Sequence, residues 1–192
     1  MISRPAIVVL LAVYYFQQKD ALQERIDGAM LLFYLTIIAS DIAFLDSPSQ
    51  NVAIVLWLIV ANYFLQIFIV LNESTFHIKN QRRFYSVLAS WIILYLIIYY
   101  FLVGISLKTI PNAVLSIELG IICTLALYRK ANKKSFEWFV VGTMLLVLSL
   151  LVSLENVKSY EVAIEILDRT AYSVGHLLIT FGILQSFVFY KQ

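Results

Sequence analysis

The chain has 192 residues, of which 61% are hydrophobic and only 14% are charged, and its mean hydropathy is +0.86. A soluble domain of this size could not bury so much apolar surface, so the composition excludes an ordinary soluble fold and predicts that lipid covers the molecule. The formal net charge of +2 argues against a nucleic-acid-binding surface. There is one cysteine, Cys123, and no Cys/His cluster of the zinc type, so we expect no intrachain disulfide, no metal site and no other cofactor.

Apolar segments separated by short polar connectors predict one transmembrane domain of the all-α class, a helix bundle that covers residues 1–192. A spanning helix needs about 20 mainly apolar residues. The first segment is short and resembles the core of a signal peptide, but no small-x-small cleavage site follows it, so we interpret it as a retained span. The seven predicted spans are residues 4–17, 28–46, 51–72, 83–105, 109–128, 136–154 and 169–190.

The basic residues of the connectors predict the orientation of the chain. Short cytoplasmic connectors are rich in Lys and Arg, and one side of the predicted bundle carries ten of these residues whereas the opposite side carries four. The side with ten should be cytoplasmic, which places the N-terminus outside and the C-terminus inside a cell inner (plasma) membrane. The ten are Lys19, Arg25, Lys79, Arg82, Arg83, Arg129, Lys130, Lys133, Lys134 and Lys191, and the four are Arg4, Lys108, Lys158 and Arg169.

Three ionisable residues lie within predicted spans, where charge is expensive and marks a functional site by default. Asp41 lies ~8 Å from the outer end of its span, Glu118 ~13 Å and His176 ~10 Å, at about 1.5 Å per residue. This shared depth in the outer half of the bilayer predicts a polar pocket. Two carboxyl groups and an imidazole suit acid–base catalysis on a bound lipid, or a proton relay, so we predict these three residues as catalytic.

Three further polar side chains are candidates for substrate binding. Tyr172 lies one helical turn before His176, on the same face of the last predicted span. Asn62 and Tyr63 lie near the middle of the third predicted span. We therefore predict that all three residues line the same pocket.

Each catalytic candidate also has a structural interpretation. Asp41 could be an interfacial residue, because Asp46 follows it closely. Glu118 could be a buried carboxyl group that is hydrogen-bonded to Ser116 or to a neighbouring helix. His176 could join two helices, as polar residues do in membranes.

Charged residues outside the spans have simpler interpretations. The basic run at residues 129–134 is typical of a cytoplasmic anchor that contacts anionic lipid headgroups. The sequence has no phosphate-binding glycine loop, nucleophile elbow or HExxH motif. The last connector is interpreted as a solvated outer surface because it contains Glu155, Lys158, Glu161, Glu165, Asp168 and Arg169.

Five short polar motifs occur in order along the chain. They are Arg4-Pro5, Ser40-Asp41, Ala61-Asn62-Tyr63, Gly142-Thr143 with Ser149-Leu150, and Tyr172-Ser173-Val174-Gly175-His176 followed by Gly182. Their order and spacing resemble those of the lysoplasmalogenase-like (YhhN) family of integral membrane proteins. That family shows a Lys-Pro helix start, Gly-Asp, Ala-His, Gly-Ala…Ser-Asp and Tyr-x-x-x-Gln. Its members usually have eight spans, so this chain would lack the first.

The resemblance implies hydrolysis or hydration of the vinyl-ether bond of lysoplasmalogens, by protonation of the enol ether and delivery of water. The chain departs from the family at three positions: the second aspartate is Leu150, the histidine is Asn62 and the glutamine is His176. A leucine neither transfers a proton nor holds a water molecule. If the activity is retained, Asp41 would act as one acid–base group, with Glu118 and His176 as replacements for the missing carboxylate and histidine.

Two classes of function are therefore open. The first is a membrane hydrolase of lysolipid ether bonds, favoured by the polar residues within the spans. The second is a non-catalytic seven-helix module, either a lipid-binding pseudoenzyme or a subunit that binds partner membrane proteins or a second copy of itself, and Leu150 favours it. A retinal protein is disfavoured because residues 170–190 contain no lysine.

Overall fold

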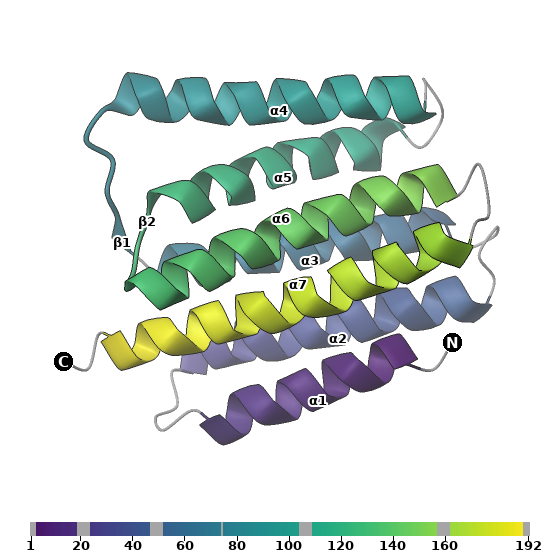
Figure 1. Cartoon of the computed structure of the whole chain (residues 1–192), viewed down its shortest axis with the longest axis horizontal. Coiled ribbons are helices and arrows are strands. Elements are labelled where there is room, and N and C mark those ends of the chain that lie inside the picture. The colour runs from purple at the N-terminus through teal and green to yellow at the C-terminus, as the bar shows by residue number, and fades with distance from the viewer. Residues whose placement is uncertain are drawn as a thin grey trace.

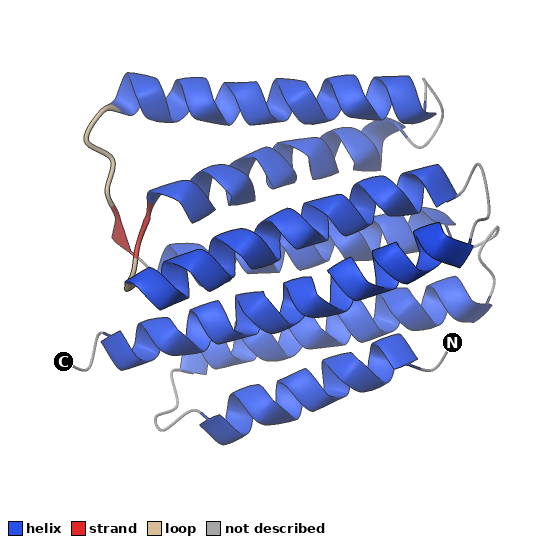
Figure 2. Ribbon diagram, viewed as in Figure 1, coloured by secondary structure: helices blue, strands red, loops and turns tan. Residues whose placement is uncertain are grey.

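The computed structural model describes residues 3–18, 24–46, 52–73, 75–103, 109–156 and 162–189. These ranges form seven helices and one two-stranded sheet, which confirms the predicted all-α class (Figures 1 and 2). The elements are α1 (Ser3–Gln18), α2 (Glu24–Asp46), α3 (Val52–Glu73), β1 (Thr75–Phe76), α4 (Gln81–Val103), α5 (Thr109–Tyr128), β2 (Arg129–Lys130), α6 (Lys133–Asn156) and α7 (Val162–Phe189).

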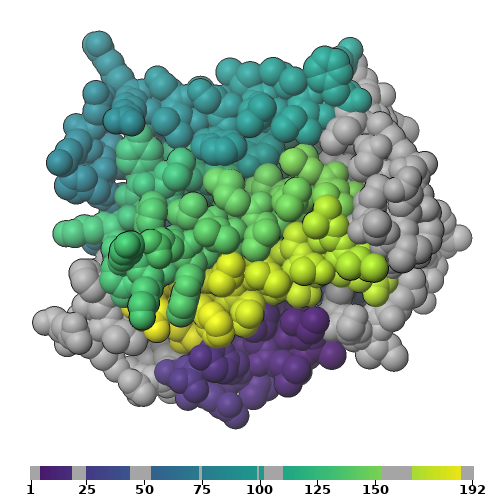
Figure 3. Space-filling view, viewed as in Figure 1, coloured from purple at the N-terminus to yellow at the C-terminus, as the bar shows by residue number. Residues whose placement is uncertain are grey.

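The helices form a bundle in which each helix runs antiparallel to the one before it (Figure 1). The first residues of α1 lie at one end of the bundle, which we call the N-terminal end. The sheet and the last residues of α7 lie at the opposite end, the C-terminal end. Helices α6 and α7 form the most extensive helix pair, whereas α1 and α4 lie at opposite edges of the bundle (Figure 3). Helix α1 packs on α2 and α7, and α4 packs mainly on α5.

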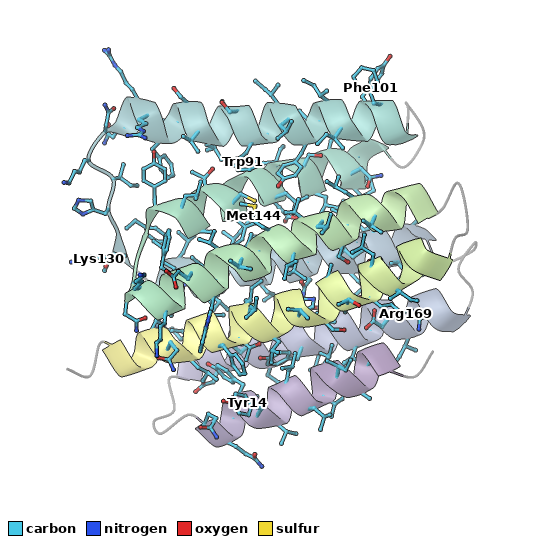
Figure 4. All side chains as sticks on the ribbon, viewed as in Figure 1. Tyr14, Trp91, Phe101, Lys130, Met144 and Arg169 are labelled. Carbon is cyan, nitrogen blue, oxygen red and sulfur yellow. The ribbon has the colours of Figure 1, made fainter. Side chains whose placement is uncertain are left out.

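Among the described residues, four helices are long and apolar enough to cross a membrane, which is compatible with a membrane-embedded protein but does not confirm the seven predicted spans. Large hydrophobic side chains are exposed on the outside of the bundle, including Leu10, Phe64 and Phe101, whose exposed fraction is 78%. In Figure 4, Phe101 points away from the bundle at the edge formed by α4. The candidate spanning segments are Arg25–Ala43, Ala53–Glu73, Ile110–Tyr128 and Lys133–Val152, and α1 contains the shorter apolar segment Pro5–Gln18.

Helix α7 is longer than the sequence predicted. It begins at Val162, seven residues before the predicted start at 169, and runs for 28 residues. The added segment places apolar residues at helical spacing and contains neither Gly nor Pro, so the helix continues through its charged residues. Consequently Asp168 is part of α7 and is buried. The prediction that it belongs to a solvated connector is wrong.

Small residues allow α6 and α7 to pack closely. A Cβ atom added at Gly142 would lie 2.8 Å from the carbonyl oxygen of Gly175, which is closer than real Cβ contacts. A Cβ atom added at Gly175 would lie 2.8 Å from Cδ2 of Leu146. Glycine is therefore required at position 142, where the added atom would meet backbone, whereas at position 175 it would meet a leucine side chain first and the backbone oxygen of Gly142 at 3.1 Å.

The same seam continues toward both ends of the bundle through hydrogen bonds. Ser135 Oγ donates to the carbonyl oxygen of Gly182 near the C-terminal end. Ser149 Oγ donates to Oδ1 of Asp168 near the N-terminal end. With Gly142 opposite Gly175, small or polar residues recur every seven positions on each helix, so the Gly142…Ser149 spacing seen in the sequence has a packing role. The recurring positions are Ser135, Gly142 and Ser149 on α6, and Asp168, Gly175 and Gly182 on α7.

A buried ion pair closes the C-terminal end of the bundle. Nη2 of Arg129 lies 2.6 Å from Oε1 of Glu73, and both side chains have no exposed surface. The same guanidinium donates to the carbonyl oxygens of Ser135 and Gly182 and lies 4.8 Å from the centre of the Phe139 ring. Arg129 therefore joins α3, α6 and α7. Its assignment to an exposed basic anchor is wrong.

Candidate functional site

Asp41, near the end of α2, meets the aromatic face of α7 inside the bundle. Asp41 is buried, and the hydroxyl of Tyr172 donates to both carboxylate oxygens over 3.4 Å. Tyr172 also packs edge-on against His176, one turn further along α7, with 4.6 Å between the ring centres. The two residues share a face because positions four apart lie above one another on a helix. Two titratable groups from different helices therefore contact one tyrosine.

Asp168 is a second buried carboxylate on α7, at helical spacing from Tyr172. It precedes Tyr172 by one turn, is 5% exposed, and accepts a hydrogen bond from Ser149 of α6. Sequence reasoning missed it because its charged neighbours suggested a connector. The spacing of Asp168, Tyr172 and His176, each four residues apart, was the signal that could have found it. We call Asp41, Asp168, Tyr172 and His176 the polar cluster.

Asn62 approaches the polar cluster from α3 but is bonded to α2. Its Nδ2 donates to the carbonyl oxygen of Phe33 over 3.1 Å and to Oγ1 of Thr36 over 3.2 Å. The Phe33 ring packs against His176, with 5.7 Å between the ring centres. Because an amide nitrogen has two protons, only Oδ1 of Asn62 is left to accept a bond from a ligand. The contacts of Asn62 therefore position α3 against α2 beside His176.

Glu118 and Tyr63 lie on another side of α3. Tyr63 follows Asn62 directly but lies on the side of α5, the helix that carries Glu118 and Cys123. Helix α3 packs against both α2 and α5, so its two consecutive polar residues face different neighbours. The structure therefore brings Asp41, Tyr172 and His176 together and places Glu118 with Tyr63.

The carboxyl group of Glu118 is buried without a full set of partners. Its Oε2 has no hydrogen-bond partner among the described residues. The hydroxyl of Ser116 donates instead to the backbone oxygen of Asn112, so the expected bond between Ser116 and Glu118 is not formed. A buried acceptor without a partner costs about 1–3 kcal/mol, which marks Glu118 as a residue that needs an explanation.

Gln66 is a second buried polar group that the sequence reasoning did not single out. It lies one turn after Asn62 and is fully buried, and neither atom of its amide has a partner in the described part of the chain. A glutamine in the apolar segment YFLQIF, four residues after another amide, was the available signal. Buried polar groups thus extend along α3 from its middle at Asn62 toward its C-terminal end.

Leu150 faces away from the polar cluster. It lines an apolar cavity of about 40 Å³ together with Leu56, Tyr95, Asn112 and Ser116, among other residues. The preceding residue, Ser149, faces α7 and binds Asp168. Consecutive residues of a helix point about 100° apart. A carboxylate is therefore absent at position 150, but one is present in space beside Ser149.

The site and the fold together define an all-helical protein with apolar helices that are suited to a membrane and a buried polar cluster between α2 and α7. Comparisons with models of protein families, with curated proteins and with solved structures found no match. The described residues contain no group of three His, Cys, Asp or Glu side chains that could hold a metal ion.

Proposed function

We propose that the chain is an integral membrane hydrolase that binds a lysolipid at the polar cluster and cleaves its vinyl-ether bond. The observation that carries the proposal is the contact of Asp41 and His176 with the same tyrosine, Tyr172, inside an apolar bundle. Ionisable groups at membrane depth are rarely retained without a function. The choice of the vinyl-ether bond comes from the resemblance to the lysoplasmalogenase-like family.

We propose seven spans with the N-terminus outside and the C-terminus in the cytoplasm. Helices α4 and α7 have 23 and 28 residues, and helices of this length exceed the bilayer core of about 30 Å at about 1.5 Å per residue. Helix α1 has 16 residues, about 24 Å, so the bilayer would thin slightly around it. The Lys/Arg bias supports this orientation, and Arg129 is the one residue of the basic group that the ion pair with Glu73 removes from the surface.

The reaction requires one proton donor and one water molecule. In the proposed mechanism, the carboxyl group of Asp41 protonates the β-carbon of the enol ether, which leaves an oxocarbenium ion. Asp168, held by Ser149, takes a proton from a water molecule as its oxygen bonds to the cationic carbon. Asp168 then passes its proton to the glycerol oxygen as the bond between that oxygen and the hemiacetal carbon breaks, while the hemiacetal hydroxyl gives its proton to His176. The products are a fatty aldehyde and the free glycerol hydroxyl group, and His176 passes its proton through Tyr172 to Asp41, which restores the starting state.

Asp168 takes the place that the sequence reasoning gave to Glu118. We assign it the second carboxylate role because it lies one turn from Tyr172, whereas Glu118 neighbours Tyr63. The catalytic role of Glu118 stays a prediction, as do the substrate-binding roles of Asn62 and Tyr63. Two variants of the purified protein separate these assignments. Asp168→Asn should abolish turnover, whereas Glu118→Gln should leave the turnover rate unchanged.

The test is a lipid hydrolysis assay on the purified protein in detergent. Release of fatty aldehyde from a vinyl-ether lysolipid is compared with product release from the matching ester and alkyl-ether lysolipids. The wild type should cleave the vinyl ether selectively, and Asp41→Asn should lower kcat/KM by about 100-fold or more, as the loss of an acid–base group does. Glu137→Gln removes an exposed carboxylate and is the matched control. Wild-type activity in the Asp41 variant would refute the mechanism.

A non-catalytic module is the second candidate. Leu150 in an apolar cavity and the internal hydrogen bonds of Asn62 favour it, because these positions would then serve packing alone. In that case the purified protein would retain lysolipid without turning it over. Stable co-purification with another membrane protein would indicate a subunit.

A further inference from the structure

The two connectors at the C-terminal end of the bundle are joined by a small antiparallel sheet. Thr75 pairs with Lys130 and Phe76 pairs with Arg129. The pairing continues where the backbone N–H of His77 donates to the carbonyl oxygen of Tyr128 over 3.0 Å. The start of α4 and the start of α6 are therefore held at the same end of the molecule, although they are far apart in the sequence (Figure 1).

Both connectors carry exposed cations next to this sheet. Lys79, Arg82 and Arg83 follow β1, and Lys133 and Lys134 follow β2, and all five residues are exposed. We call these five residues the basic platform. Lys130 on β2 marks its position in Figure 4, at the opposite end of the bundle from Arg169. The carboxylate of Glu137 lies 3.8 Å from Lys133, and both side chains are largely exposed, so it offsets little of the platform's charge.

Helix stability does not explain the cations of the platform. The first turns of α4 and α6 contain no acidic residue, and cations at a helix N-terminus oppose the helix dipole. The caps are supplied by neutral side chains instead. Oδ1 of Asn80 accepts from the N–H of Arg83 over 3.2 Å, and Oδ1 of Asn132 accepts from the N–H of Ser135 over 2.7 Å. The charges are therefore retained at the expense of helix stability, which points to an anionic partner.

We propose that the basic platform binds the headgroups of acidic phospholipids. Helices α3, α5 and α6, which end or begin at the platform, are long and apolar enough to span a bilayer, so the platform falls at the depth of the headgroups. Tyr85, 63% exposed, follows Arg83 closely and suits the same interfacial depth. The proposal depends on the membrane placement and is independent of the catalytic mechanism.

The experiment measures lipid binding to the purified full chain in detergent by native mass spectrometry. Phosphatidylglycerol and phosphatidylcholine of identical acyl chains are added in turn. The wild type should retain phosphatidylglycerol in preference, and Lys133→Gln/Lys134→Gln and Arg82→Gln/Arg83→Gln should each weaken its retention roughly 30-fold, at about fivefold per cation near an acidic surface. All four positions are exposed, so the variants should fold, and circular dichroism verifies this.

The matched control is Arg4→Gln/Arg169→Gln, which removes two cations from the opposite, N-terminal end of the bundle, one at the start of α1 and one in α7. It should leave the preference for phosphatidylglycerol unchanged. Equal retention of the two lipids by the wild type, or equal loss in the control and in the platform variants, would overturn the proposal. The proposal would also be overturned if inorganic phosphate, in the absence of acidic lipid, occupied the platform as fully as phosphatidylglycerol does. None of these outcomes bears on vinyl-ether cleavage, which the lysolipid assay measures separately.

Discussion

The two ends of the bundle bury polar groups in different ways. At the C-terminal end, Arg129 and Glu73 are 2.6 Å apart, and the guanidinium has further partners on α6 and α7. At the N-terminal end, Ser149 holds Asp168 over 2.5 Å, but the hydroxyl of Tyr172 reaches Asp41 only over 3.4 Å. Short, shared bonds hold helices in one arrangement, whereas the long bonds to the Asp41 carboxylate are weaker. We infer that the ion pair serves stability and that the contact between Asp41 and Tyr172 serves the proposed function.

The largest expected effect comes from breaking the ion pair. Arg129→Met removes the ion-pair partner of the buried Glu73, so we expect the free energy of unfolding to fall by about 3–5 kcal/mol. Thermal unfolding in detergent measures it. Adding Glu73→Leu to Arg129→Met should recover a large part of the loss, because replacing both ions removes the unpaired charge. A destabilisation of less than 1 kcal/mol in Arg129→Met would show that the ion pair does not stabilise the C-terminal end as proposed.

A smaller effect is expected at the seam that connects the two ends. Gly142→Ala places a methyl group 2.8 Å from the carbonyl oxygen of Gly175, and the helices must move apart. We expect a loss of about 1–3 kcal/mol in unfolding experiments. Gly28→Ala is the matched control because an added Cβ atom there has no neighbour within 4 Å, and it should be neutral or slightly stabilising.

The smallest change in stability is expected within the polar cluster. Tyr172→Phe removes the long hydrogen bonds to Asp41, so the free energy of unfolding should shift by about 1 kcal/mol or less. Turnover of the vinyl-ether lysolipid should nevertheless fall about fivefold or more, because one hydrogen bond of about 1 kcal/mol to the acid–base group is lost. A variant that loses stability and activity in proportion would assign Tyr172 to packing alone.

The sequence predicts the class of the fold well because hydropathy reports directly on burial in lipid. It also predicts that Asp41, Tyr172 and His176 lie close together, because Asp41 and His176 are expected at a similar depth and Tyr172 lies one helical turn before His176. It cannot predict which neighbour a side chain faces. Spacing along a span gives height, but the order of the helices around the bundle decides whether Glu118 meets Asp41 or Tyr63.

Two buried charges were missed for a related reason. Asp168 and Arg129 occur in charged segments that are typical of connectors, and local sequence gives no sign that either is enclosed. Their partners lie far along the chain: Ser149 binds Asp168, and Glu73 binds Arg129. The packing of α6 against α7 and of α3 against β2 therefore decides whether these two charged side chains are buried. Local composition alone predicts that they are exposed.

The small sheet has a consequence for how the protein is assembled. Pairing of Thr75 with Lys130 closes a loop of chain that contains all of α4 and α5. In the proposed seven-span topology, the two strands can meet only after this helical hairpin has entered the bilayer and returned to the side from which it started. Pairing of β1 with β2 is therefore a late step of biogenesis, and it fastens the hairpin, including the peripheral helix α4, to the rest of the protein at its open end.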